Sequence, residues 1–257
     1  IQQALREVYD VALSVAEELY PEQWMKLSPR VLSIASWVGY DLDGRTDITW
    51  ATSLYTRMKV QVVQLGYYLS ALNKIISSHI DERDELGTTL ALIKSKITLA
   101  LHVAEKETAF FKNGNASEEE LKEVSRSIVG DDGGRLVHTA ELIDSINRAV
   151  SLSKDVALKR SLIILRSELA NYGLASSHMH VRLNSAQLHN AIRKNIGMEG
   201  EPDDPGRRRG NFRALSGLLD EVKPIHINFG SLSAEHTTAK RMFMLIAQMI
   251  KYVDASS

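Results

Sequence analysis

The sequence contains no cysteine, which excludes disulfide bridges, thiol catalysis and zinc sites with thiolate ligands. Glycine and proline are scarce, with 15 and 5 among 257 residues, and aromatic residues make up only 6 %. Small all-β folds require many tight turns and more aromatic residues, so this composition argues against them. The shortages therefore favour a chain that is mainly helical.

An excess of charge of either sign is also missing. Lysine and arginine number 31 against 32 aspartate and glutamate residues, so the chain lacks the basic excess that nucleic-acid-binding proteins carry. No run of about 18 apolar residues occurs, so we expect no segment to cross a membrane. Hydrophobic residues still make up 44 %, which is enough for a sizeable core. These features predict a cytoplasmic protein that binds neither nucleic acid nor membranes.

Apolar residues recur at helical spacing over most of the chain. The main apolar stripes, each of which predicts a helix, lie at residues 5–19, 54–76, 90–101, 137–165 and 239–253. Proline, acidic residues and three consecutive arginines at residues 199–210 predict a flexible loop. The pattern indicates one helical domain over residues 1–257.

Two stretches are typical of buried strands, residues 31–39 and 175–183, and residues 225–227 are a third candidate. Both of the first two end in polar residues before a helix resumes, which is how a strand presents chemistry at its carboxyl end. The expected fold is therefore mainly α, with long helices and two or three short strands.

The first strand candidate leads into two carboxylates, Asp41 and Asp43, beside glycines. Such a pair can ligate a cation or anchor an arginine. Alternatively, Asp43 simply forms a turn with Gly44, and Asp41 caps the following helix.

The same stretch is similar to the opening motif of haloacid-dehalogenase-type phosphatases, in which the first aspartate is the nucleophile. Asp131 and Asp132 would then supply the later magnesium-binding motif. Against this interpretation, Arg45 replaces the expected threonine, and that fold needs strands and helices in regular alternation. The sequence therefore favours a phosphatase less than the alternatives described below.

The second strand candidate carries His178, His180 and Arg182, which share a face because strand positions two apart point the same way. With His189 they could bind a metal. They could equally reach into a phosphate or carboxylate pocket, with Arg182 as the charge anchor. The remaining alternative is an exposed face of an edge strand, or hydrogen-bonded histidines in a core.

Taken together, the two stretches resemble the phosphoenolpyruvate carboxylase family. Where the family has Ser-Trp-x-Gly-Gly-Asp-Arg-Asp-Gly-Asn-Pro, residues 36–46 read Ser-Trp-Val-Gly-Tyr-Asp-Leu-Asp-Gly-Arg-Thr. Where it has Phe-Gly-Leu-x-x-x-Arg-Leu-Asp-Ile-Arg-Gln-Glu-Ser, residues 172–185 read Tyr-Gly-Leu-Ala-Ser-Ser-His-Met-His-Val-Arg-Leu-Asn-Ser. The order of the motifs and the long helical insert between them also agree. The chain departs from the family at Tyr40, Leu42, His178 and His180.

The resemblance implies that the chain is an internal piece of a longer carboxylase-like protein, a slice of a helix-rich barrel of eight strands. The reaction implied converts phosphoenolpyruvate and bicarbonate to oxaloacetate and phosphate. By resemblance Arg182 holds the phosphate of phosphoenolpyruvate, Trp37 forms an apolar wall, and Asp41 and Asp43 are the acidic pair beneath the substrate.

The resemblance also implies a Mg²⁺ cofactor, with its ligands and the catalytic histidine outside these residues. We therefore expect the isolated chain to be inactive. Unpaired strand edges and apolar stripes would need partners, which favours a homo-oligomer. The competing hypothesis is a binding or regulatory module that kept the fold and lost the chemistry, and the four departures from the motifs favour it.

Overall fold

The computed structural model describes most of the chain: residues 2–43, 45, 47–79, 84–111, 116–130, 134–193, 205–221, 223 and 226–256. These residues are mainly helical, which confirms the expected class. None of the described helices combines the length and the apolar content that crossing a membrane would require.

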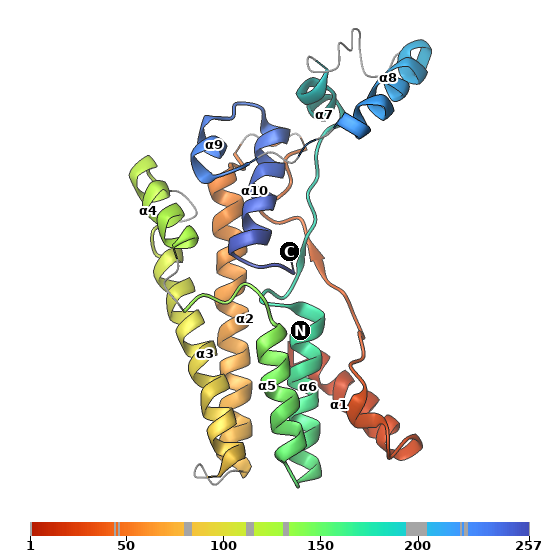
Figure 1. The fold of residues 1–257 in the computed structure, drawn as a ribbon, viewed down its shortest axis with the longest axis vertical. Coiled ribbons are helices and arrows are strands. Elements are labelled where there is room, and N and C mark those ends of the chain that lie inside the picture. The colour runs from red at the N-terminus through yellow and green to blue at the C-terminus, as the bar shows by residue number, and fades with distance from the viewer. Residues whose placement is uncertain are drawn as a thin grey trace.

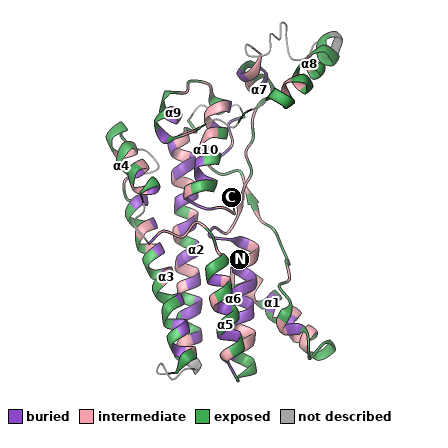
Figure 2. Ribbon diagram, viewed as in Figure 1, coloured by how far each residue is buried: buried purple, intermediate pink, exposed green. Residues whose placement is uncertain are grey.

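Four long helices form the body of the molecule: α2 (Trp50–His79), α3 (Glu85–Thr108), α5 (Ala140–Leu152) and α6 (Val156–Tyr172). They pack lengthwise, α2 along α3 and α5 along α6, while α1 (Gln2–Leu19) lies against α6 (Figure 1). Their facing sides are buried (Figure 2). This first core is built mainly from aliphatic residues, among them Leu65, Leu72, Ile93, Ile97, Ile146, Leu162 and Leu165.

A second core surrounds the other end of α2. There α4 (Glu118–Val129), α9 (Phe229–Ala234) and α10 (Thr238–Tyr252) gather near the amino-terminal half of α2 (Figure 1). Its buried residues include Leu54, Met58, Phe111, Ile128, Met242 and Leu245. Since α2 contributes to both cores, it is the element that joins the two ends of the molecule.

The remaining helical elements are η1 (Trp24–Lys26), α7 (Ser185–Ile192), α8 (Pro205–Leu218) and η2 (Leu219–Glu221). Figure 1 shows α8 projecting away from the body. The expected loop at residues 199–210 is therefore wrong for residues 205–210, which form the first turns of α8, while residues 199–204 lie outside the described residues. Pro205 is the first helical residue, a position that suits its fixed φ and its missing N–H.

The two strand candidates form a parallel pair, but each is shorter than expected. β1 (Ala35–Ser36) pairs with β2 (His178–Met179), with Ala35 opposite His178. A turn closed by the Tyr40 N–H on the Trp37 carbonyl at 2.9 Å interrupts the first stretch. The pairing then resumes at a single bridge between Asp41 and Arg182.

Within the described residues this is the one sheet, so the expectation of two strands is met. In the third candidate, residues 226 and 227 are not in a strand, and residue 225 lies outside the described part. The carbonyl of Ile227 accepts instead from the Gln248 side chain at 3.0 Å.

A buried ion pair ties β2 to α2 and to the C-terminal turn. Arg57 on α2 and Asp254 are 2 % and 1 % exposed and pair with each other. Arg57 Nη1 also donates to the carbonyl of Ser177, immediately before β2, at 2.6 Å. Asp254 Oδ1 in turn accepts from the N–H of Ser256 at 2.9 Å. The start of β2 is therefore held by a charged side chain of the helix behind it.

Removing one partner of this pair should destabilise the fold strongly. Arg57→Ala leaves the buried Asp254 carboxylate without its cation, and we expect it to lower the free energy of unfolding by about 3–5 kcal/mol. Urea unfolding followed by circular dichroism measures the change. Arg126→Ala, which removes an exposed partner of Glu123, is the control and should have little effect. Equal small losses in both variants would contradict this role.

A second buried charge, Glu168 on α6, is only partly satisfied. It is 2 % exposed, and the Tyr67 hydroxyl donates to its Oε1 at 2.8 Å. Its Oε2 has no hydrogen-bond partner among the described residues. Burial raises the pKa of this carboxyl above its ordinary value, because the apolar surroundings disfavour the ionised form.

Stability should therefore depend on the ionisation of Glu168. A carboxyl with a raised pKa contributes stability below its unfolded pKa and loses it as the pH rises through the folded value. Glu168→Gln should unfold at a higher urea concentration than the wild type at pH 7, and the advantage should disappear near pH 4. If the two proteins differ equally at both pH values, ionisation of Glu168 is not the cause.

Candidate functional site

The two motifs meet because β1 and β2 run parallel. The carboxyl ends of parallel strands lie at the same edge of a sheet, so the residues that follow each strand come together. The residues brought to this edge from the two stretches are Trp37, Asp41, Asp43, His180, Arg182 and Asn184. They include all four residues that the resemblance assigns to substrate binding, namely Trp37, Asp41, Asp43 and Arg182.

Arg182 is the centre of this group. Its Nη1 lies 3.7 Å from Asp41 Oδ2, and its guanidinium carbon lies 5.7 Å from the centre of the Trp37 ring. His180 meets the same ring edge-on, with ring centres 6.4 Å apart. The Arg182 side chain remains 48 % exposed and Trp37 52 % exposed. A cation beside an aromatic face, with N–H groups open to solvent, is an arrangement that can receive an anion.

The two carboxylates have different partners. Asp41 faces Arg182, and its Oδ1 is buried without a hydrogen-bond partner among the described residues. Asp43 Oδ1 instead accepts from Asn184 Nδ2 at 3.3 Å, across the two strand ends. Asp41 therefore anchors an arginine, one of the alternatives open from the sequence. It does not cap the following helix, because α2 begins only at Trp50.

The turn that leads from β1 to Asp41 depends on Gly39. Its φ is +82°, in the left-handed region, and a Cβ there would meet the side chain of Thr56 on α2. Ser53 on α2 donates from its hydroxyl to the Gly39 carbonyl at 2.6 Å. The helix thus holds the turn that places Trp37 and Asp41 on the same side.

Two of the departures from the family motif serve the core. Tyr40 and Leu42, which stand for glycine and arginine, are 4 % and 1 % exposed and belong to the second core. Burial raises the pKa of the Tyr40 hydroxyl above its ordinary value. These two residues alternate along the chain with Asp41 and Asp43, and their side chains belong to the core.

The histidines do not form a metal site. His178 Nδ1 lies 3.0 Å from the Ser256 carbonyl, His180 is exposed beside Trp37, and His189 is buried in α7. Across the described residues, no group of three or more histidine, aspartate or glutamate side chains gathers as metal ligands. The histidine metal site that the sequence left open is therefore absent from this part of the chain.

The phosphatase alternative is not favoured by this geometry. Asp41, which would be its nucleophile, is held against Arg182 with its other oxygen buried. Asp131 and Asp132, the candidates for its later acidic motif, lie outside the described residues.

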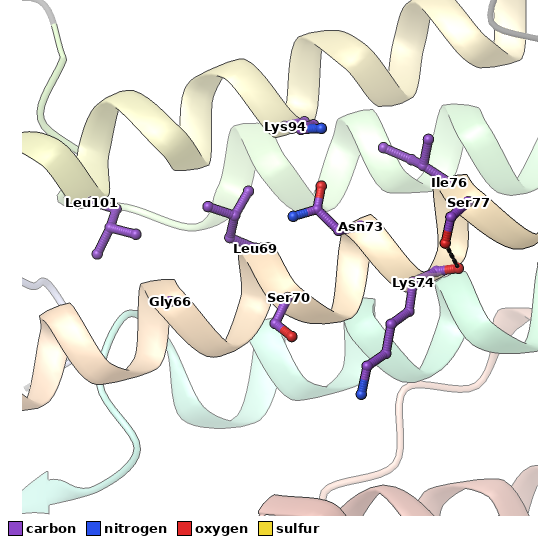
Figure 3. A pocket seen from close by; sticks show the side chains of 9 residues that line it. All are labelled: Gly66, Leu69, Ser70, Asn73, Lys74, Ile76, Ser77, Lys94 and Leu101. Atoms are coloured by element: carbon purple, nitrogen blue, oxygen red, sulfur yellow. Dashed lines mark hydrogen bonds between the residues drawn. The ribbon is translucent and has the colours of Figure 1, made fainter.

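A hollow of about 800 Å³ lies between α2 and α3, away from the strand ends (Figure 3). Figure 3 shows Leu69 and Asn73 projecting from α2 toward α3, whereas Lys74 extends away from it. Among the described residues that line it, none is a carboxylate or a histidine. It therefore lacks an acid–base pair, and we place the candidate site at the strand ends.

Sequence reasoning missed two residues that support the site. Arg57 lies inside the long helix α2, and no local sequence pattern marks it. Asn184 lies within the second motif stretch, where it received no role, and its side-chain oxygen also caps α7 by accepting from the Ala186 N–H at 2.8 Å. Its position three residues before Gln187, as a capping box, was the signal that could have identified it.

No family model, curated protein or solved structure matches this chain, so its function is argued from the residues of this site.

Proposed function

We propose that this chain supplies the phosphate-binding wall of a phosphoenolpyruvate carboxylase-like active site. One observation carries the proposal: the parallel pairing of β1 and β2 brings together two motif segments that lie far apart in the sequence, since Asp43 and its partner Asn184 are 141 positions apart. A chance resemblance at two short motifs would give no reason for their functional residues to meet at one sheet edge.

Arg182 would bind the phosphate of phosphoenolpyruvate. Its guanidinium is charged at every relevant pH, and its planar N–H groups match phosphate oxygens. Asp41 holds it from one side at 3.7 Å, and Trp37 packs along it, so its orientation is restricted before substrate arrives. The exposed face of Trp37 would lie against the methylene carbon of the substrate.

In the proposed reaction, bicarbonate attacks the phosphorus and the bond to the enol oxygen breaks, which yields carboxyphosphate and the enolate of pyruvate. Carboxyphosphate then releases carbon dioxide and phosphate, and the enolate carbon attacks the carbon dioxide to form oxaloacetate. Arg182 would stabilise charge on the phosphoryl oxygens throughout the transfer. The apolar face of Trp37 would keep water from protonating the enolate.

The Mg²⁺ that the resemblance implies is not held by these residues. Asp41 is directed at Arg182 and Asp43 at Asn184, so the pair does not present a shared set of oxygens to a cation. No step of the proposed chemistry is assigned to a metal bound here.

A binding or regulatory module is the second candidate. It is favoured by His180, which stands beside Trp37 where the family motif has an aspartate. Such a module would use the same Arg182 to bind phosphoenolpyruvate or a related anion without turnover.

Arg182→Ala in the intact protein should lower kcat/KM for phosphoenolpyruvate by about tenfold to a hundredfold, the value of one charge-assisted hydrogen bond. Oxaloacetate formation coupled to malate dehydrogenase measures it. Arg45→Ala is the matched control, because that arginine lies near the end of the first motif stretch but pairs with Asp47. Unchanged kinetics in the Arg182 variant would remove this residue from the site. Phosphoenolpyruvate binding that needs Arg182, without any turnover, would establish the module instead.

The 257-residue chain by itself should form no oxaloacetate from phosphoenolpyruvate, bicarbonate and Mg²⁺. The reason is that the resemblance places the catalytic histidine and the metal ligands outside these residues. The coupled assay with the isolated chain tests this. Turnover above the blank would show that the catalytic groups lie within these 257 residues and would contradict the proposal of a partial site.

A further inference from the structure

A separate hollow of about 450 Å³ opens beside the beginning of the strand pair. Four parts of the chain line it: the segment before β1, the start of α5, the end of α6 and the C-terminal turn, together with His178 of β2. Its polar lining residues are Arg30, Ser33, Thr139, Asn171, His178 and Ser256. The volume is in the range of small-molecule sites, and the hollow shares no residue with the Trp37–Arg182 group.

Among the described residues that line it, this hollow carries a positive charge at Arg30. Arg30 and His178 are the ionisable side chains among its lining residues. Arg30 is exposed and makes no hydrogen bond or ion pair with another described residue. The nearby Asp254 does not offset it, because this carboxylate is fully buried and paired with Arg57.

His178 is oriented by the C-terminal turn. Its Nδ1 lies 3.0 Å from the carbonyl of Ser256, and since a carbonyl only accepts, Nδ1 carries the hydrogen. The ring is therefore held in one tautomer, in which Nε2 only accepts, so the donors to an oxyanion in this hollow are other side chains.

We propose that this hollow binds a small molecule bearing an oxyanion, a phosphate or a carboxylate. Arg30 supplies the planar guanidinium that fits either group, and the hydroxyls of Ser33 and Thr139 can donate to its oxygens. A bound ligand touches the segment that enters β1 as well as β2 itself. Binding therefore stabilises the strand pairing on which the Trp37–Arg182 site depends.

Isothermal titration of the 257-residue chain with inorganic phosphate and with succinate tests the proposal. We expect saturable binding of at least one of them, weakened about tenfold or more by Arg30→Ala and less by Arg30→Lys. Arg208→Ala, which removes an exposed arginine of α8, should leave this binding unchanged. Circular dichroism and urea unfolding establish that each variant is folded.

Each outcome decides the matter. Binding of phosphate alone or of succinate alone identifies the ligand group and supports the site. Binding of neither anion overturns the proposal. Equal weakening by Arg208→Ala shows that the anion is attracted non-specifically, which overturns the proposal. Weakening by Arg182→Ala but not by Arg30→Ala places the anion at the strand-end site, which overturns the proposal as well. Failure here leaves the carboxylase proposal standing, because that proposal is tested through Arg182.

Discussion

The parallel pairing of β1 with β2 is the constraint on which the candidate site depends. The N–H groups of His178, His180 and Arg182 donate to the carbonyls of Ile34, Ser36 and Tyr40 at 2.8, 2.9 and 3.2 Å. These few bonds set the register that places Arg182 against Asp41 and Trp37. So short a ladder is weak alone, and the Arg57–Asp254 pair reinforces it by holding the Ser177 carbonyl. The helices from α2 to α6 form the long connection that parallel strands require.

The helices were predictable from apolar spacing, but which face each one buries was not. In α1 the stripe through Val8, Val11, Val15 and Leu19 stays exposed, while Tyr9 and Leu13 are buried. Periodicity shows that a helix is amphipathic, whereas the face that packs is decided by partners distant in the sequence. The predicted length of the first strand was wrong for a related reason. The turn at Gly39 interrupts a stretch of apolar residues that looks continuous in the sequence.

The site itself was predictable at the residues carried by motifs and not beyond them. Trp37, Asp41 and Arg182 meet as the two motifs suggest, since the strands that carry them pair in parallel. The Arg57–Asp254 pair joins residues almost two hundred positions apart in an otherwise ordinary helix and tail, so no local pattern marks it. Tyr40 and Leu42 differ from the motif that the chain resembles, and the structure explains both residues by their burial in the second core. What remains exposed is an arginine held by a carboxylate beside an aromatic ring, which is the basis of the proposed phosphate contact.

Hydrogen–deuterium exchange of individual amides, followed by NMR, tests the strand pairing most directly. The N–H groups of His178, His180, Arg182 and Leu42 are each bonded across the pair. They should exchange far more slowly than in an unfolded chain. If these four amides exchange at unfolded rates while the core of α6 stays protected, the strands do not pair. The account of how the site is assembled would then be wrong.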